Sequence, residues 1–203
     1  MANEYVTSAA LKATLTLTGE TFADADVAVA VESASRGIDE LCERRFWLDA
    51  DALQVRYYDA ISRDLVRIDD LVTLTSLVTD PGGDGTFEET WTVNTDYILT
   101  PMNAAADGRP YETITRHPSG DYLFPVLYPR AIKVTGKFGW SAIPPAIVEA
   151  TTILAARLLK RSREAPFGIT GMGLDGGAVH IARTDPDIKF LTAGLIRGGM
   201  GFA

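Results

Sequence analysis

The spacing of apolar residues along this chain changes twice, and each change limits the folds that it can adopt. Over residues 25–46 apolar residues recur every three or four positions, which is the period of a helix with one buried face. Over about 53–138 they alternate with polar residues, and clusters of Gly, Pro and Asp mark turns between the alternating runs. The helical period returns over 146–163. The chain is therefore predicted to be α+β, with an antiparallel sheet inserted between helices.

The two long helices are expected to pack against each other through their apolar stripes. The first stripe is Val27, Val31, Ala34, Ile38 and Leu41. The second is Ile147, Thr151, Leu154 and Leu158, widened by Val148, Ala155 and Leu159. Asp24 or Asp26 is expected to open the first long helix, and Thr7 is expected to cap a short helix before it. The predicted segments are a helical part at 1–50, the β subdomain at 51–140, the closing core helix at 141–165, and a glycine-rich arm with the C-terminal tail at 166–203.

The arm and tail are unusual for a compact enzyme. Residues 168–177 include five glycines, and backbone of this composition is costly to order without a partner. Beyond the arm, Asp185 and Pro186 are expected to begin a short helix, with the aspartate as its cap and the proline in its first turn. Such a helix is too short to persist alone, so the tail is expected to leave the body of the chain and to pack on a partner molecule or a neighbouring subunit.

Two sets of residues are candidates for contact with that partner. The first set lies in the tail, where Ile188, Leu191, Leu195 and Ile196 are expected to share one helical face. The full list is Asp185, Pro186, Ile188, Phe190, Leu191, Leu195 and Ile196. The alternative set is the basic end of the closing helix, at Arg157, Arg161 and Arg163.

Composition argues against several classes of function. The net charge of −8 argues against non-specific binding of nucleic acid, which needs clustered Lys and Arg, but it suits a wall past which DNA slides. No apolar run reaches the roughly 18 residues of a membrane-spanning helix. The first residues lack the basic and apolar regions of a signal peptide, so folding in a cytoplasm is expected.

No set of residues predicts catalysis, a metal or a cofactor. The two histidines, His117 and His180, are far apart and lack a third ligand at metal-site spacing, so both are interpreted as exposed structural residues. Cys42 lies in a helical stripe and is expected to be a small buried side chain. The adjacent pairs at 69–70 and 88–89 are expected to point to opposite faces of strands, at solvated edges or turns. The segment 80–85 is interpreted as a hairpin connection rather than a calcium loop.

Several motifs, in their order and spacing, resemble the head-to-tail connector (adaptor) proteins of long-tailed bacteriophages. The similarity extends over nearly the whole chain. The segments that carry it are 5–7, 33–46 with its I-D-x-x-C-x-R-x-F pattern, 96–99 with 103–108, 134–140 followed by Ile143 and Pro144, 155–161, and 183–188.

This resemblance implies a structural protein of the virion, made in the host cytoplasm and placed at the head–tail interface. It implies a helical connector core, a homo-oligomeric ring that is twelvefold in relatives, and a C-terminal arm that reaches the portal protein. It also implies a DNA channel through the ring, which the genome crosses without specific binding, and a platform for a downstream neck protein (stopper or tail).

An alternative reading is a small-molecule or glycan-binding β module of a virion protein. It rests on aromatic residues in the middle of the chain, which could form a binding platform if they were exposed. These residues are Trp91, Tyr97, Tyr111, Tyr122 and Tyr128.

Overall fold

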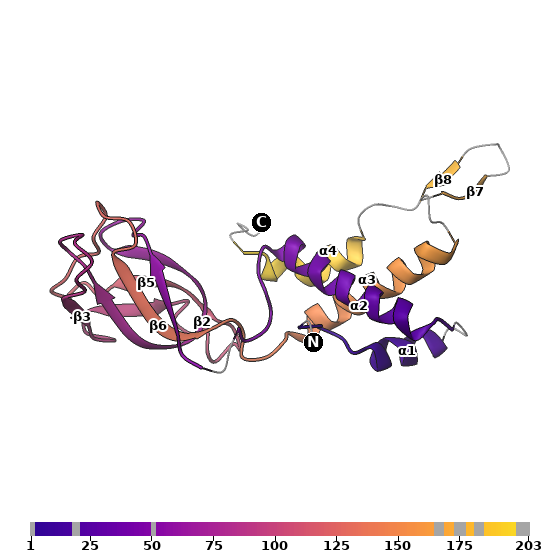
Figure 1. Cartoon of the computed structure of the whole chain (residues 1–203), viewed down its shortest axis with the longest axis horizontal. Helices are drawn as coiled ribbons and strands as arrows, with labels where there is room; N and C mark the ends of the chain where they lie inside the picture. The colour runs from indigo at the N-terminus through magenta and orange to yellow at the C-terminus, as the bar shows by residue number, and fades with distance from the viewer. Residues whose placement is uncertain are drawn as a thin grey trace. The chain divides into compact units, whose positions relative to one another are not determined.

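The computed structural model describes residues 3–17, 21–49, 52–164, 169–172, 178–180 and 185–197. The chain forms two compact units: a helical unit from Met1–Phe46 together with Ile143–Ala203, and a sheet unit from Trp47–Ala142. The described part holds four α-helices and a six-stranded antiparallel sheet, so the predicted α+β class is confirmed (Figure 1).

The helical unit contains α1 (Ser8–Leu17), α2 (Asp24–Cys42), α3 (Pro145–Glu164) and α4 (Pro186–Thr192), followed by the 3₁₀ turn η1 (Ala193–Leu195). Thr7 caps α1 as expected, because its hydroxyl accepts the backbone N–H of Ala10 at 3.1 Å. By contrast, α2 begins at Asp24 without a side-chain cap, since Ala23 occupies the cap position.

Contact between α2 and α3 forms the centre of the helical unit. Val27, Val31, Ala34 and Ile38 of α2 are buried as predicted, whereas Leu41 is 38% exposed and Cys42 takes the buried place at the end of the stripe. The buried stripe of α3 includes Ile147, Ala155 and Leu159, and Leu154 and Leu158 are only half-buried beside it. The predicted stripe of α3 is therefore confirmed at Ile147 and Thr151, and in its second half Ala155 and Leu159, expected to widen it, are buried more deeply than Leu154 and Leu158.

The end of α2 is fixed by backbone geometry rather than by its charged residues. Glu43 adopts a left-handed conformation (φ 53°), and the N–H of Arg44 donates to the carbonyl of Asp39 at 3.2 Å. The helix consequently ends at Cys42, four residues before the predicted end at Phe46. The N-terminal segment crosses this region, where Tyr5 donates its hydroxyl to Asp39 and accepts the N–H of Phe46.

The sheet unit has the strand order β1–β6–β2–β5–β4, and β3 pairs with β2. Every pairing between these strands is antiparallel. The strands are β1 (Gln54–Tyr58), β2 (Leu65–Thr79), β3 (Glu89–Trp91), β4 (Tyr97–Thr100), β5 (Tyr111–Arg116) and β6 (Ile132–Phe138). The long strand β2 has register shifts between Arg67 and Leu71, between Leu71 and Thr73, and between Leu74 and Ser76. Its first half pairs with β5, and its second half pairs with β3 and β6.

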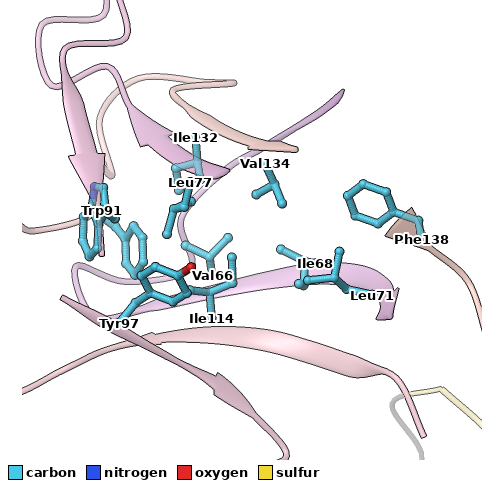
Figure 2. Packing of buried hydrophobic residues seen from close by; sticks show 11 residues of the cluster. Val66, Ile68, Leu71, Leu77, Trp91, Tyr97, Ile114, Ile132, Val134 and Phe138 are labelled. Carbon is cyan, nitrogen blue, oxygen red and sulfur yellow. The ribbon is translucent and has the colours of Figure 1, made fainter. Parts of the chain in front are cut away.

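Large side chains fill the interior of the sheet unit. Figure 2 shows Trp91 and Tyr97 at one end of this core and Leu71 and Phe138 at the other, with Val66 between them. The ring of Trp91 stacks on Phe124 with centroids 4.3 Å apart. These residues come from distant segments of the sheet unit, so the core packs its first and last strands into one structure.

The last pair of strands lies within the predicted arm. β7 (Ile169–Met172) and β8 (Ala178–His180) form a two-stranded antiparallel sheet, drawn beyond the end of α3 in Figure 1. The remaining residues of the predicted glycine-rich arm, 168 and 173–177, lie outside the described residues, as do 181–184.

Candidate assembly surface

The C-terminal tail is a capped helix that packs against α3. The carboxylate of Asp185 accepts the N–H of Asp187 at 2.9 Å, and Pro186 occupies the first turn, so the predicted start of this helix is confirmed. The second carboxylate oxygen of Asp185 lies 2.5 Å from a guanidinium nitrogen of Arg157 on α3. A single buried side chain therefore starts α4 and joins it to its neighbour.

Apolar and polar contacts continue along the tail. Ile188 and Leu195 are buried, and Thr192 is buried between them with its hydroxyl donating to the carbonyl of Ile188 at 2.8 Å. The N–H of Arg197 donates to the carbonyl of Cys42 at the end of α2, at 2.8 Å. The expectation that the tail leaves the body is therefore wrong for 185–197, because α4 packs on α3, Asp185 pairs with Arg157, and Arg197 bonds to Cys42.

The predicted common face of the tail is only partly formed. Leu191 is half-buried, and Ile196 is exposed because the α-helix ends at Thr192 and the chain is extended at Ile196. Pro186 is exposed. Phe190 is 83% exposed, and it is the most exposed large apolar side chain among the residues that the structure describes. Docking of α4 therefore orients Phe190 toward solvent.

The three arginines of the alternative set have different surroundings. Arg157 is engaged by Asp185. Arg163 is exposed, but its guanidinium lies 4.7 Å from the ring centroid of Phe22 and 3.4 Å from the carbonyl of Thr21. Arg161 is exposed at the end of α3. Of this set, Arg161 is the residue whose position best suits contact with another molecule.

Sequence reasoning missed two residues of this surface. Thr192 is buried within the tail, and the backbone N–H of Arg197 joins the end of the tail to α2. Thr192 lies four residues after Ile188, and this helical spacing is a signal that could have placed it on the buried face. No local pattern points to the bond between Arg197 and Cys42, because it joins distant parts of the sequence.

The residues considered for chemistry have structural partners. Cys42 is buried as predicted, and burial raises the pKa of its thiol to about 11. His117 is half-buried rather than exposed, and its ring accepts the N–H of Ser119 at 3.2 Å. The side chain of His180 lies outside the described residues. Within the described ranges, no three His, Cys, Asp or Glu side chains gather where one metal ion could bind.

The carboxylate pairs diverge, as predicted for neighbours on a strand. Asp69 accepts from Arg56 and Tyr58, whereas Asp70 accepts the indole N–H of Trp140 at 2.8 Å. Asp70 is buried, so the predicted solvated edge is wrong for this residue. Glu88 is exposed, and Glu89 accepts the hydroxyl of Thr79.

The predicted hairpin connection is confirmed at 80–85, between β2 and β3. Asp80 accepts the N–H groups of Gly83 and Gly85 at 2.7 Å each, which gives both of its carboxylate oxygens a role in the turn.

The aromatic residues behind the alternative reading do not form a platform. Trp91 and Tyr97 are buried in the core of the sheet unit, and Tyr111 and Tyr122 pack against that core. Tyr128 alone among the five is more than one-third exposed, at 38%. These five side chains therefore do not form the exposed aromatic surface that the glycan-binding alternative requires.

No protein-family model matches the chain, and no curated protein matches it. The chain is similar to a chain in the neck of an empty gene transfer agent particle, computed with C6 symmetry. Identity is 17%, the alignment covers 90% of this chain and 94% of that one, and the TM-score is 0.49. It is also similar to a chain in the virion of a native gene transfer agent particle, with 18% identity, coverage of 89% and 93%, and a TM-score of 0.49. None of the helices in the described ranges has the length and apolar character needed to cross a membrane.

Proposed function

We propose that this chain is a structural protein of a bacteriophage neck. In this proposal it forms a head-to-tail adaptor ring, of twelve copies, that docks beneath the portal protein and extends the DNA channel. The ring provides the platform on which a downstream stopper or tail protein assembles. The protein is made in the host cytoplasm and resides at the head–tail interface of the virion.

The observation that carries this proposal is the placement of Phe190. A seven-residue helix is too short to be stable by itself, and here it is fixed by the Asp185 cap, the ion pair with Arg157 and the burial of Ile188. The helix nevertheless leaves a phenylalanine 83% exposed. A phenylalanine held outward on an ordered helix is a rigid aromatic anchor, and aromatic side chains are enriched in protein interfaces.

The organisation of the chain supports the same proposal. The sheet unit at Trp47–Ala142 is inserted between two parts of one helical unit, and the motifs that resemble the connector family lie in both units in the expected order. The chain carries a net charge of −8, which suits a channel wall that double-stranded DNA passes without binding.

A point substitution tests the portal contact better than a truncation. Removing the residues after 177 would also remove α4, which packs against α3, so loss of binding could follow from damage to the body. We expect Phe190→Asp to weaken co-sedimentation with assembled portal rings by about tenfold or more, the effect of a typical interface anchor.

The matched control is Leu127→Asp, which alters a side chain that is 81% exposed in the sheet unit. We expect this control variant to bind portal rings as the unaltered chain does. If Phe190→Asp binds with unchanged affinity, the tail is not the portal contact. The same assay on Arg161→Glu would then test the basic end of α3.

A further inference from the structure

We infer that the ring is held together by a contact between oppositely charged surfaces of the helical unit: the solvent face of α2 in one copy meets the end of α3 with α4 in the next. This inference rests on the proposed function, because the second copy is the neighbour in the adaptor ring. It names the surfaces through which the ring forms, which are distinct from the portal contact at Phe190.

The acidic surface is the side of α2 that faces away from its buried stripe. Glu32 and Glu40 are exposed there, at helical spacing opposite Val31, Ala34 and Ile38, and Glu43 is exposed directly after the last residue of the helix. Arg36 lies on the same side, but its charge is balanced by Asp39, with the guanidinium and carboxylate 3.1 Å apart. The acidic surface therefore keeps three carboxylates exposed to solvent.

An apolar side chain lies within this acidic surface. Val29 is 65% exposed, one helical turn before Glu32 and Ser33. A protein interface usually combines an apolar centre with a polar rim, and Val29 with the three glutamates has this composition. Charge alone would also be satisfied by dissolved cations, whereas the exposed valine gains only from contact with another molecule.

The basic surface is formed where α4 begins on α3. All four basic residues of α3 lie in its second half, at Arg157, Lys160, Arg161 and Arg163. Arg161 is exposed and Lys160 is half-buried. Lys189 on α4 is exposed, and α4 is joined to this part of α3 by the Asp185–Arg157 ion pair. Lys160, Arg161 and Lys189 make up the basic surface.

The acidic and basic surfaces overlap in their position along the axes of α2 and α3. Arg163 at the end of α3 lies 3.4 Å from the carbonyl of Thr21, just before α2, so the basic end of α3 is level with the start of α2. The other end of the tail reaches the last turn of α2 through the Arg197–Cys42 bond. A neighbour displaced sideways therefore brings Glu32 near Lys160 and Arg161 without a shift along the helices.

This contact joins the acidic surface of one copy to the basic surface of the next. A pair of copies therefore still has one free acidic surface and one free basic surface, to which further copies can bind. Contacts of this kind propagate from copy to copy and close into a ring when the rotation between neighbours divides a full turn. The complementary charges also disfavour pairing of like surfaces, acidic with acidic or basic with basic. The surfaces thus specify a head-to-tail order of subunits.

Charge reversal on each surface tests the inference by sedimentation velocity and electron microscopy. The acid-reversed variant carries Glu32→Lys, Glu40→Lys and Glu43→Lys, and the base-reversed variant carries Lys160→Glu, Arg161→Glu and Lys189→Glu. We expect each variant alone to self-associate at least about tenfold more weakly than the unaltered chain at low salt. Raising salt from about 0.05 to 0.5 M should weaken the unaltered assembly, because the surface charges become screened.

Mixing the acid-reversed and base-reversed variants is the decisive experiment. The reversed α2 of one variant now complements the reversed α3–α4 surface of the other, so an equimolar mixture should assemble again, with the variants alternating. The control is Glu88→Lys, Asp107→Lys and Asp121→Lys, which changes the net charge as the acid-reversed variant does, but at exposed positions of the sheet unit. This control variant should assemble normally.

Three outcomes would overturn the inference. The first is that the acid-reversed variant alone assembles as the unaltered chain does, and the second is that the mixture does not assemble although circular dichroism shows both variants folded. The third is that the unaltered chain stays monomeric up to millimolar concentration at low salt. The first two outcomes leave the proposed function intact as long as the unaltered chain forms rings on portal. Failure of the unaltered chain to bind portal at all would instead contradict the proposed function.

Discussion

The helical unit and the sheet unit fill their interiors with side chains of different size. The sheet unit buries Trp91, Phe124 and Phe138 in one cluster with β-branched and leucine side chains. The α2–α3 contact of the helical unit buries Ala34 and Ala155, and Gly37 allows Leu154 of α3 to approach closely. The comparison teaches that large rings fill the interior of the sheet unit, whereas small side chains at the α2–α3 contact let the two helices approach closely.

The largest expected effect is in the core of the sheet unit. Phe138→Ala should lower the free energy of unfolding of this unit by about 3–5 kcal/mol, because the ring is fully buried. All three tryptophans of the chain, Trp47, Trp91 and Trp140, lie in the sheet unit, so their fluorescence in a denaturant titration reports its unfolding. If fluorescence and circular dichroism at 222 nm shift together, the two units unfold as one and the comparison fails.

A second effect tests the helical unit. Ile38→Ala should cost about 2–5 kcal/mol, because Ile38 is fully buried on α2. The matched control is Leu41→Ala, one turn along the same helix, which should cost less than about 1 kcal/mol since Leu41 is 38% exposed. Circular dichroism at 222 nm during urea unfolding measures both. Equal losses would show that the predicted stripe, with Leu41 inside, was right after all.

A smaller effect is expected at a glycine of the sheet unit. Gly139 has a φ of 108°, and a Cβ at this position would lie 2.1 Å from the carbonyl oxygen of Trp47. Gly139→Ala should therefore destabilise the sheet unit by about 1–3 kcal/mol in the fluorescence assay. Gly108→Ala is the control, because Gly108 also has a positive φ but open space around it. A smaller loss at Gly139 than at Gly108 would contradict the close approach of the two segments.

The smallest effect concerns the docking of α4. Asp185→Ala removes the cap and the partner of Arg157, and it should cost about 1–2 kcal/mol locally while leaving the rest of the helical unit folded. Hydrogen exchange of the amides at 188–195 should become faster, and exchange within α2 should not change. Asp187→Ala, at an exposed position of the same turn, should have less effect. Exchange that stays slow in Asp185→Ala would show that the ion pair and cap do not hold the tail.

Local patterns predicted the features that depend on neighbouring residues. The two changes in apolar spacing predicted the α+β class. Thr7 and Asp185 cap the starts of helices, and Pro186 lies in a first turn, as the sequence predicted. The ends of elements were harder to predict, because the end of α2 depends on the left-handed conformation of Glu43. The strands β4 and β5 were not predicted individually, since both are short and their burial does not alternate regularly.

The candidate surface depended on contacts between distant residues, which local patterns do not encode. The glycines of 168–177 suggested a separate tail, yet Asp185 meets Arg157 and Arg197 meets Cys42. Residues expected to touch a partner, such as Ile188 and Leu195, are instead buried within this chain. The exposure of Phe190 follows from that docking, so it could be identified only once the side of α4 facing α3 was known.

The most direct test of an assembly role is an image of the unaltered chain mixed with portal rings. The proposed function predicts a ring of twelve copies stacked on each portal, with one channel continuous through both rings. Portal rings that remain bare at saturating concentration of the chain, or that carry scattered single copies without a ring, would contradict it.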